Sequence, residues 1–156
     1  MVVQLLKSFH MLDTLLKRYK SRRQIYADFY EKQLLQYRHK PVNLLQVGIE
    51  NSIPALHKFL LRANIYCIDK FDRVEPKKFK FLENTRIFWS RCDIDDEYKI
   101  KEMMTEIWNK PRFDIIIDNS SNFANTRFAF LKKYCIGNYY IEAVSYTHLR
   151  AHETLP

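Results

Sequence analysis

The N-terminal part of the chain has a helical pattern of apolar residues. These residues recur at steps of three and four, as on one face of an amphipathic helix. They are Leu5, Phe9, Leu12, Leu16 and Tyr19. A second helix is predicted over residues 24–37, and Pro41 then breaks the helical pattern. Residues 1–40 are therefore expected to form an N-terminal helical segment.

From Pro41 onward, short apolar runs alternate with segments of helix length. The predicted strands are 42–47, 65–68, 85–90, 113–118 and 139–144. The predicted helices are 54–62, 95–108 and 125–134, and residues 72–82 form a polar loop. The unbroken apolar centre of FDIIID at 113–118 is typical of a strand buried on both faces. This alternation predicts an α/β fold over residues 41–144, a Rossmann-like parallel sheet flanked by helices.

The last residues, 145–156, do not continue the pattern. They have no strand or helix period, and they resemble a translated sequencing adapter. We therefore expect a non-native tail, a chain truncated near Val144, and an unpaired outer edge on the fifth strand. His148 and His152 are not predicted to bind a metal, because their order is not H-E-x-x-H and no third ligand is obvious.

The stretch from Asn43 to Phe71 has the layout of a nucleotide-binding βαβ unit. Gly48 ends the first predicted strand, and Asp69 ends the second, 21 residues later. Such a glycine lets the backbone turn close to a ligand, and the strand-end carboxylate accepts hydrogen bonds from ribose hydroxyls. Only one glycine of the motif G-x-G-x-x-G is present, because Asn51 and Ser52 occupy the following turn.

Polar or acidic residues follow all five predicted strands. Ligands of open α/β sheets bind at the carboxyl ends of the strands, so these residues form the candidate site. They are Gly48 with Glu50 and Asn51, then Asp69, Asp93, Asp118 with the residues to Asn122, and Glu142. One aspartate after a strand is also typical of a turn or helix cap, so only the whole set favours a binding site.

Composition and charge limit the classes of protein to which the chain can belong. A chain of 156 residues suits one domain with a sizeable core, and no apolar run reaches the roughly 18–20 residues of a membrane span. Cys67, Cys92 and Cys135 are far apart, so three reduced, buried thiols of a cytoplasmic protein are expected. Of the net charge of +8, +6 falls in residues 1–40. That segment could face nucleic acid, an anionic membrane or an acidic partner, although a solvated helix face is the ordinary explanation.

Five motifs in order resemble the class I S-adenosylmethionine-dependent methyltransferases. The resemblance is to the branch near macrocin O-methyltransferase and the cephalosporin-hydroxylase-like proteins, which reads LLEIGV, IYGID, a GDQ-like segment, FDIIIDDGSH and YVIED. This chain reads LLQVGI at 44–49, IYCID at 65–69, RCDIDD at 91–96, FDIIIDNSSN at 113–122 and YYIEA at 139–143. The resemblance implies seven strands in the order 3-2-1-4-5-7-6, and five of them are visible in this chain.

The resemblance also implies roles for the candidate residues. The implied cofactor-binding residues are Gly48, Glu50, Asn51, Asp69 and Asp93, which would hold S-adenosylmethionine with Asp69 at its ribose. Asp118 would be the catalytic residue, and Asp118 and Glu142 would bind a magnesium ion that holds the acceptor hydroxyls. The implied reaction is methyl transfer to a hydroxyl of a small molecule or sugar.

The chain departs from the family pattern at several positions. Asn119, Ser120 and Asn122 replace the second acid, the glycine and the histidine of DDGSH, and Ala143 replaces the last acid of IED. These departures leave open a catalytically inactive Rossmann-like domain associated with glycan biosynthesis proteins. The basic N-terminal segment leaves open a nucleic-acid-associated protein, and Asp69 leaves open an NAD-dependent oxidoreductase. Nucleic acid is the less favoured partner, and the oligomeric state is not predicted.

Overall fold

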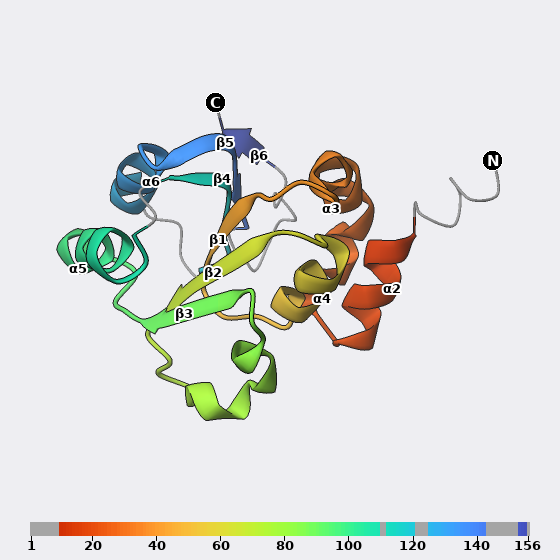
Figure 1. The fold of residues 1–156 in the computed structure, drawn as a ribbon, viewed down its shortest axis with the longest axis horizontal. Helices are drawn as coiled ribbons and strands as arrows, with labels where there is room; N and C mark the ends of the chain where they lie inside the picture. The colour runs from red at the N-terminus through yellow and green to blue at the C-terminus, as the bar shows by residue number, and fades with distance from the viewer. Residues whose placement is uncertain (1–9, 110–111, 121–124, 143–152, 156) are drawn as a thin grey trace. The chain divides into compact units, whose positions relative to one another are not determined.

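The computed structural model describes residues 10–109, 112–120, 125–142 and 153–155 (Figure 1). Several positions discussed above lie outside the described residues, namely Leu5, Phe9, Asn122, Ala143, His148 and His152. The chain divides into two compact units, Met1–Pro41 with Glu50–Ala63, and Val42–Ile49 with Asn64–Pro156. Within the described ranges, no helix has the length and apolar character needed to cross a membrane.

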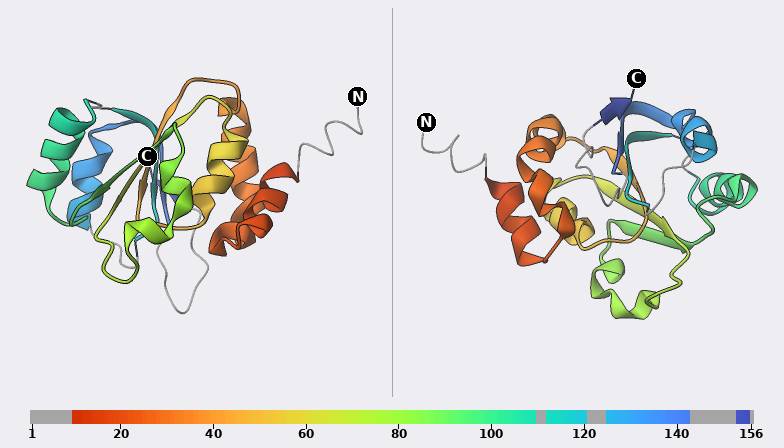
Figure 2. Two further views of the ribbon diagram at one scale, coloured as in Figure 1. Left: turned by 60° about the horizontal axis from the view of Figure 1, so that its bottom comes forward. Right: turned by 180° about the vertical axis from the view of Figure 1, so that it is seen from behind.

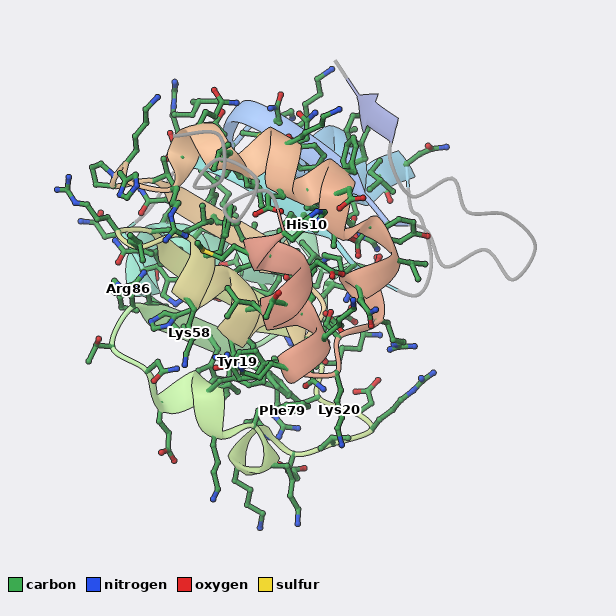
Figure 3. The ribbon with its side chains drawn as sticks, turned by 90° about the vertical axis from the view of Figure 1, so that its right-hand side faces the viewer. His10, Tyr19, Lys20, Lys58, Phe79 and Arg86 are labelled. Atoms are coloured by element: carbon green, nitrogen blue, oxygen red, sulfur yellow. The ribbon has the colours of Figure 1, made fainter. Side chains whose placement is uncertain are left out.

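The first unit consists of short helices. They are α2 (Met11–Arg18), η1 (Arg22–Tyr26), α3 (Ala27–Leu34), η2 (Leu35–Tyr37) and α4 (Ser52–Phe59). α2 packs against α3 and α4, and its Leu12 and Leu16 are fully buried, as the amphipathic pattern predicts. The ammonium group of Lys58 on α4 lies 5.8 Å from the centre of the Tyr19 ring at the end of α2 (Figure 3). The helix predicted over 24–37 is divided, because 3-10 turns flank α3.

The second unit is a six-stranded sheet in the order β3-β2-β1-β4-β5-β6 (Figure 1). Its strands are β1 (Asn43–Val47), β2 (Asn64–Asp69), β3 (Ile87–Arg91), β4 (Phe113–Asp118), β5 (Cys135–Ile141) and β6 (Glu153–Leu155). β1 to β5 are parallel, and their register places Val47 beside both Ile68 and Asp118. The predicted Rossmann-like parallel sheet is confirmed, and its five parallel strands follow the order that the resemblance implies.

The outer edge of the sheet differs from the expectation. β5 begins at Cys135 and includes Gly137, where an added Cβ would lie 2.1 Å from the carbonyl oxygen of Asp114. β6 pairs antiparallel with residues 139–141 of β5, so the expectation of an unpaired edge was wrong for these residues. Main-chain pairing over three residues needs no side-chain alternation, so a sequence pattern does not detect it.

Two helices cover one face of the sheet, α5 (Glu97–Glu102) and α6 (Asn125–Lys132), and a π-helical turn, η5 (Met103–Ile107), continues α5 (Figure 2). An apolar cluster joins these helices to the strands. It includes Leu45, Ile68, Ile116, Ile100, Met104 and Leu131. All three cysteines are free, and Cys135 is half-buried. The packed sheet therefore holds the carboxyl ends of its parallel strands at one edge.

Candidate active site at the carboxyl ends of the strands

The turn after β1 depends on Gly48. This residue has a φ of +93°, in the left-handed region that favours glycine, and its N–H donates to the carbonyl of Ile68 at 2.8 Å. An added Cβ would lie 2.8 Å from the carbonyl oxygen of Asn119, and the Asn119 N–H donates to Val47 at 2.8 Å. Gly48 therefore allows the backbone turn after β1 to lie against the turn after β4.

Asp69, at the end of β2, is held beside the Gly48 turn. Its Oδ2 accepts the backbone N–H of Ile49 at 2.7 Å, and its Oδ1 accepts the backbone N–H of Phe71 at 2.6 Å. Phe71 has a φ of +53°, a conformation that bulky residues rarely adopt and that clusters at functional sites. An ionised carboxylate has about four acceptor positions, so Asp69 retains capacity for ligand hydroxyls beyond these two bonds.

Asp93 lies at the exposed rim of the same edge. Its Oδ1 accepts the backbone N–H of Asp95 at 3.0 Å and lies 3.5 Å from the ammonium group of Lys70. The hydrogen bond from Asp95 and the charge of Lys70 lower the pKa of Asp93, although its slight burial acts in the opposite direction. The backbone N–H of Cys92 donates to the carbonyl of Asp69 at 2.8 Å. Asp93 therefore presents an ionised group next to the end of β2.

Glu50 and Asn51 belong to the first unit. The Glu50 carboxylate accepts hydrogen bonds from Ser21 Oγ at 2.8 Å, the Arg22 N–H at 2.9 Å and the Ser52 N–H at 2.7 Å. Glu50 therefore connects the segment before η1 to the first turn of α4. Asn51 occupies the N-cap position of α4 without a side-chain capping bond, so neither Asn51 nor Ser52 supplies the helix cap. The cofactor-binding roles of Glu50 and Asn51 stay predictions.

The charges around Glu50 decide its ionisation. Burial opposes the charged form of the carboxylate, but the Arg23 charge and the hydrogen bonds from Ser52 and Ser21 outweigh it. The pKa of Glu50 is therefore lowered from its ordinary value. The Arg23 guanidinium, itself buried, also donates to Ser52 Oγ and lies 5.3 Å from the centre of the Tyr30 ring.

Asp118, at the end of β4, has a partner that the sequence analysis missed. The Arg127 guanidinium, from α6, donates through Nε to Asp118 Oδ2 at 2.9 Å, and it also donates to Asp95 and Ser120. Burial opposes the charge of Arg127, but the nearby Asp118 and Asp95 carboxylates raise its pKa. In the sequence, the signal for such a partner was Asp118 itself. It ends a strand predicted to be buried, and a buried charge needs a paired counter-charge.

The remaining donors to Asp118 come from Ser120 and Tyr139. Ser120 donates to Oδ1 through Oγ at 2.6 Å and through its backbone N–H at 3.1 Å, and the Tyr139 hydroxyl donates to Oδ2 at 3.2 Å. Burial and the Asp118 charge both raise the pKa of Tyr139. The carboxylate therefore receives four hydrogen bonds from the chain itself.

Magnesium does not fit at Asp118 in this arrangement. A hard cation binds through free carboxylate oxygens, and both oxygens of Asp118 already accept two hydrogen bonds each. Glu142 is buried, and its backbone N–H donates to the carbonyl of Asp118 at 2.8 Å. Among the described residues, no three His, Cys, Asp or Glu side chains gather as a metal site. Metal binding by Asp118 and Glu142 stays a prediction that this geometry does not support.

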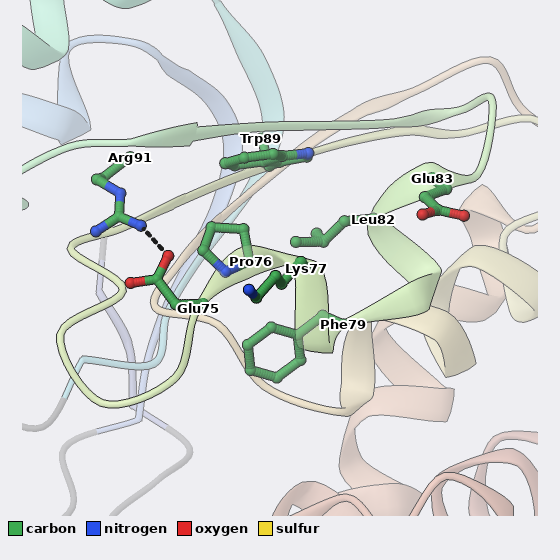
Figure 4. Close-up of a pocket in the computed structure, with 8 residues that line it drawn as sticks. All are labelled: Glu75, Pro76, Lys77, Phe79, Leu82, Glu83, Trp89 and Arg91. Atoms are coloured by element: carbon green, nitrogen blue, oxygen red, sulfur yellow. Dashed lines mark hydrogen bonds and ion pairs between the residues drawn. The ribbon is translucent and has the colours of Figure 1, made fainter.

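A separate pocket of about 480 Å³ lies between β3 and the loop before it (Figure 4). Trp89 and Arg91 of β3 line one side, and the loop that contains η3 (Pro76–Lys78) and η4 (Lys80–Glu83) lines the other. The Arg91 guanidinium pairs with the Glu75 carboxylate at 2.7 Å. The pocket includes none of the predicted site residues.

Comparison with known proteins identifies the fold. No protein-family profile and no curated protein sequence matches the chain. Among solved structures, the MycE methyltransferase of the mycinamycin biosynthetic pathway, in complex with Mg and SAH, is similar to it. That structure has a TM-score of 0.69 and 26% identity, over 87% of this chain and 35% of the MycE chain.

A second structure of MycE, in complex with Mg, SAH and mycinamycin VI, has a TM-score of 0.71 and 24% identity. It covers 84% of this chain and 38% of the MycE chain, so the present chain spans little more than a third of the length of this neighbour. The fold is therefore that of the class I S-adenosylmethionine-dependent methyltransferases. The branch near macrocin O-methyltransferase stays a prediction.

Proposed function

We propose that this chain belongs to an S-adenosylmethionine-dependent methyltransferase that acts on a hydroxyl of a small molecule or sugar. The observation that carries the proposal is the Asp69 carboxylate, fixed at 2.7 Å from the N–H of Ile49 beside the glycine turn. MycE, which has the same fold, was crystallised with SAH, and one of its structures also contains a macrolide, mycinamycin VI.

The chain's own residues suit adenosylmethionine. Asp69 has acceptor positions left for the two ribose hydroxyls, and Gly48 keeps the turn after β1 free of a side chain. Asp93 offers an ionised acceptor just after the end of the next strand, β3. When bound, adenosylmethionine supplies a methyl group on a positively charged sulfur. Arg127, Ser120 and Tyr139 hold the Asp118 carboxylate, and in this proposal Asp118 fixes Ser120 and Tyr139 at the edge where the acceptor would bind.

Calorimetric titration with SAH tests the proposal. The wild-type chain is expected to bind SAH, and Asp69→Asn is expected to weaken binding by about ten- to a hundredfold, because a hydrogen bond to a charged group contributes about 1.5–3 kcal/mol. Asp72→Asn is the matched control, since Asp72 is an exposed acid three residues further on. Circular dichroism verifies that each variant is folded. Absence of heat from wild type with both SAH and adenosylmethionine would contradict the proposal.

One observation favours a second function, a cofactor-binding domain without transfer activity. All the acceptor positions of the Asp118 carboxylate are engaged by the chain, which leaves none for an acceptor hydroxyl or a metal in the resting site. Transfer of a labelled methyl group to a panel of hydroxylated acceptors distinguishes the two functions. SAH binding without transfer to any acceptor would support the second function, and transfer would exclude it.

A further inference from the structure

Asp118 is saturated by donors that belong to the chain. Its side chain is 2% exposed, and it accepts four hydrogen bonds, two on each carboxylate oxygen. An ionised carboxylate has about four lone-pair positions. A metal ion could bind Asp118 only after at least one of these donors had left.

The strongest of these donors is itself a cation. The Arg127 side chain is 2% exposed, and its guanidinium makes ion pairs with both Asp118 and Asp95. A second cation at Asp118 would meet the repulsion of this buried guanidinium at short range, where water screens charges weakly. Charge, as well as hydrogen bonding, therefore opposes magnesium at this position.

Four separate segments build the cluster. Asp118 ends β4 and Ser120 follows it, Tyr139 lies on β5, Arg127 lies on α6, and Asp95 precedes α5. α6 contributes Leu131 and α5 contributes Ile100 to the apolar core, so packing of the core supports the position of the guanidinium. The partners of Arg127 come from the end of β4, the segment directly after it and the segment before α5, so the tertiary fold brings them together.

We propose that Arg127 is the resident cation of this strand end and stands in place of the magnesium ion that the sequence motif implies at Asp118. Asp118 is then a positioning residue, which fixes Ser120 and Tyr139, and it is not a metal ligand. One consequence rests on the proposed function: methyl transfer by this site needs no divalent ion on Asp118.

Manganese(II) is a paramagnetic probe for magnesium sites and tests the inference in the full chain without cofactor. In a two-dimensional amide NMR spectrum, Mn²⁺ bound to Asp118 would broaden the signals of Ser120 and Glu142 first, because both amides bond to Asp118. We expect substoichiometric Mn²⁺ to leave these two signals as sharp as those of the remaining chain. Their selective loss in wild type would overturn the inference, and this readout requires no variant to fold.

Electron paramagnetic resonance of free Mn²⁺ then compares affinities. Loss of a second-shell partner of a metal already weakens binding by about ten- to a hundredfold, so loss of a carboxylate ligand should weaken it at least as much. We expect wild type and Asp118→Asn to bind Mn²⁺ equally, whereas a tenfold weaker variant would overturn the inference. Arg127→Lys keeps the positive charge and is expected to behave as wild type. Neither measurement uses adenosylmethionine, so a failure of the proposed function, seen as absent SAH binding, is separate from a failure of this inference.

Discussion

Arg127 Nε donates a hydrogen bond to Asp118 Oδ2 across 2.9 Å, and both side chains are 2% exposed. Arg127→Met would leave the Asp118 charge buried without a counter-charge, which costs about 3–5 kcal/mol of folding free energy. Urea denaturation measures this loss. Lys133→Met is the control, because Lys133 is exposed and its replacement should stay within about 0.5 kcal/mol of wild type. Equal losses in the two variants would show that the buried pair contributes little.

Gly48→Ala should destabilise the chain through its backbone conformation. An alanine at a φ of +93° is strained by about 1–2 kcal/mol, and its Cβ would also lie 2.8 Å from the carbonyl oxygen of Asn119. The free energy of unfolding in urea measures the effect. Asn51→Ala, three residues further on, removes an exposed side chain that makes no capping bond and should be nearly neutral. A neutral Gly48→Ala would mean that the turn after β1 differs from the one described.

Glu50 should contribute a pH-dependent part of the stability. Its pKa in the folded chain is lowered from the ordinary value of 4.5, so it stabilises the folded state above that value. This stabilisation is lost as the pH falls below 4.5 and passes through the lowered pKa. Glu50→Gln removes the titrating group and should therefore flatten the acid side of the stability profile.

The midpoint of thermal unfolding, measured at a series of pH values from neutral to below 4.5, tests this effect. The difference between wild type and Glu50→Gln should be largest at neutral pH and should shrink below 4.5. Glu83→Gln is the control, because Glu83 is exposed and its profile should follow that of wild type. A constant difference between wild type and Glu50→Gln at every pH would contradict the assigned ionisation.

The strands could be predicted because their side chains carry the signal. The FDIIID run defines β4 with the bounds that the structure gives, Phe113–Asp118, since a strand buried on both faces is continuously apolar. The fifth strand was predicted to begin at Tyr139, whereas β5 begins at Cys135, because Gly137 was taken for a turn although it lies inside the strand. There, Gly137 permits the close approach of Asp114, and a contact between distant residues leaves no local pattern.

The sequence predicted that the site lies at the carboxyl ends of the strands. It did not predict which residues would bond to the acidic side chains there. Parallel strands necessarily bring Asp69, Asp93 and Asp118 to one edge, so their common location followed from the fold. In the sequence, Arg127 cannot be distinguished from other basic residues on helices, because its contact with Asp118 forms only in the tertiary fold. Glu50 reads as a ligand after a glycine turn, whereas its partner Ser21 lies 29 residues upstream.

The proposed function requires that Asp69 binds the ribose of an adenosine-containing cofactor. A thermodynamic cycle tests it most directly, with wild type and Asp69→Asn each titrated with SAH and with an SAH analogue that lacks both ribose hydroxyls. We predict that wild type prefers SAH by about tenfold or more and that the variant shows little preference, since the bond lost is the same in both cases. Wild-type binding of both ligands with equal affinity, or an unchanged preference in the variant, would contradict the account.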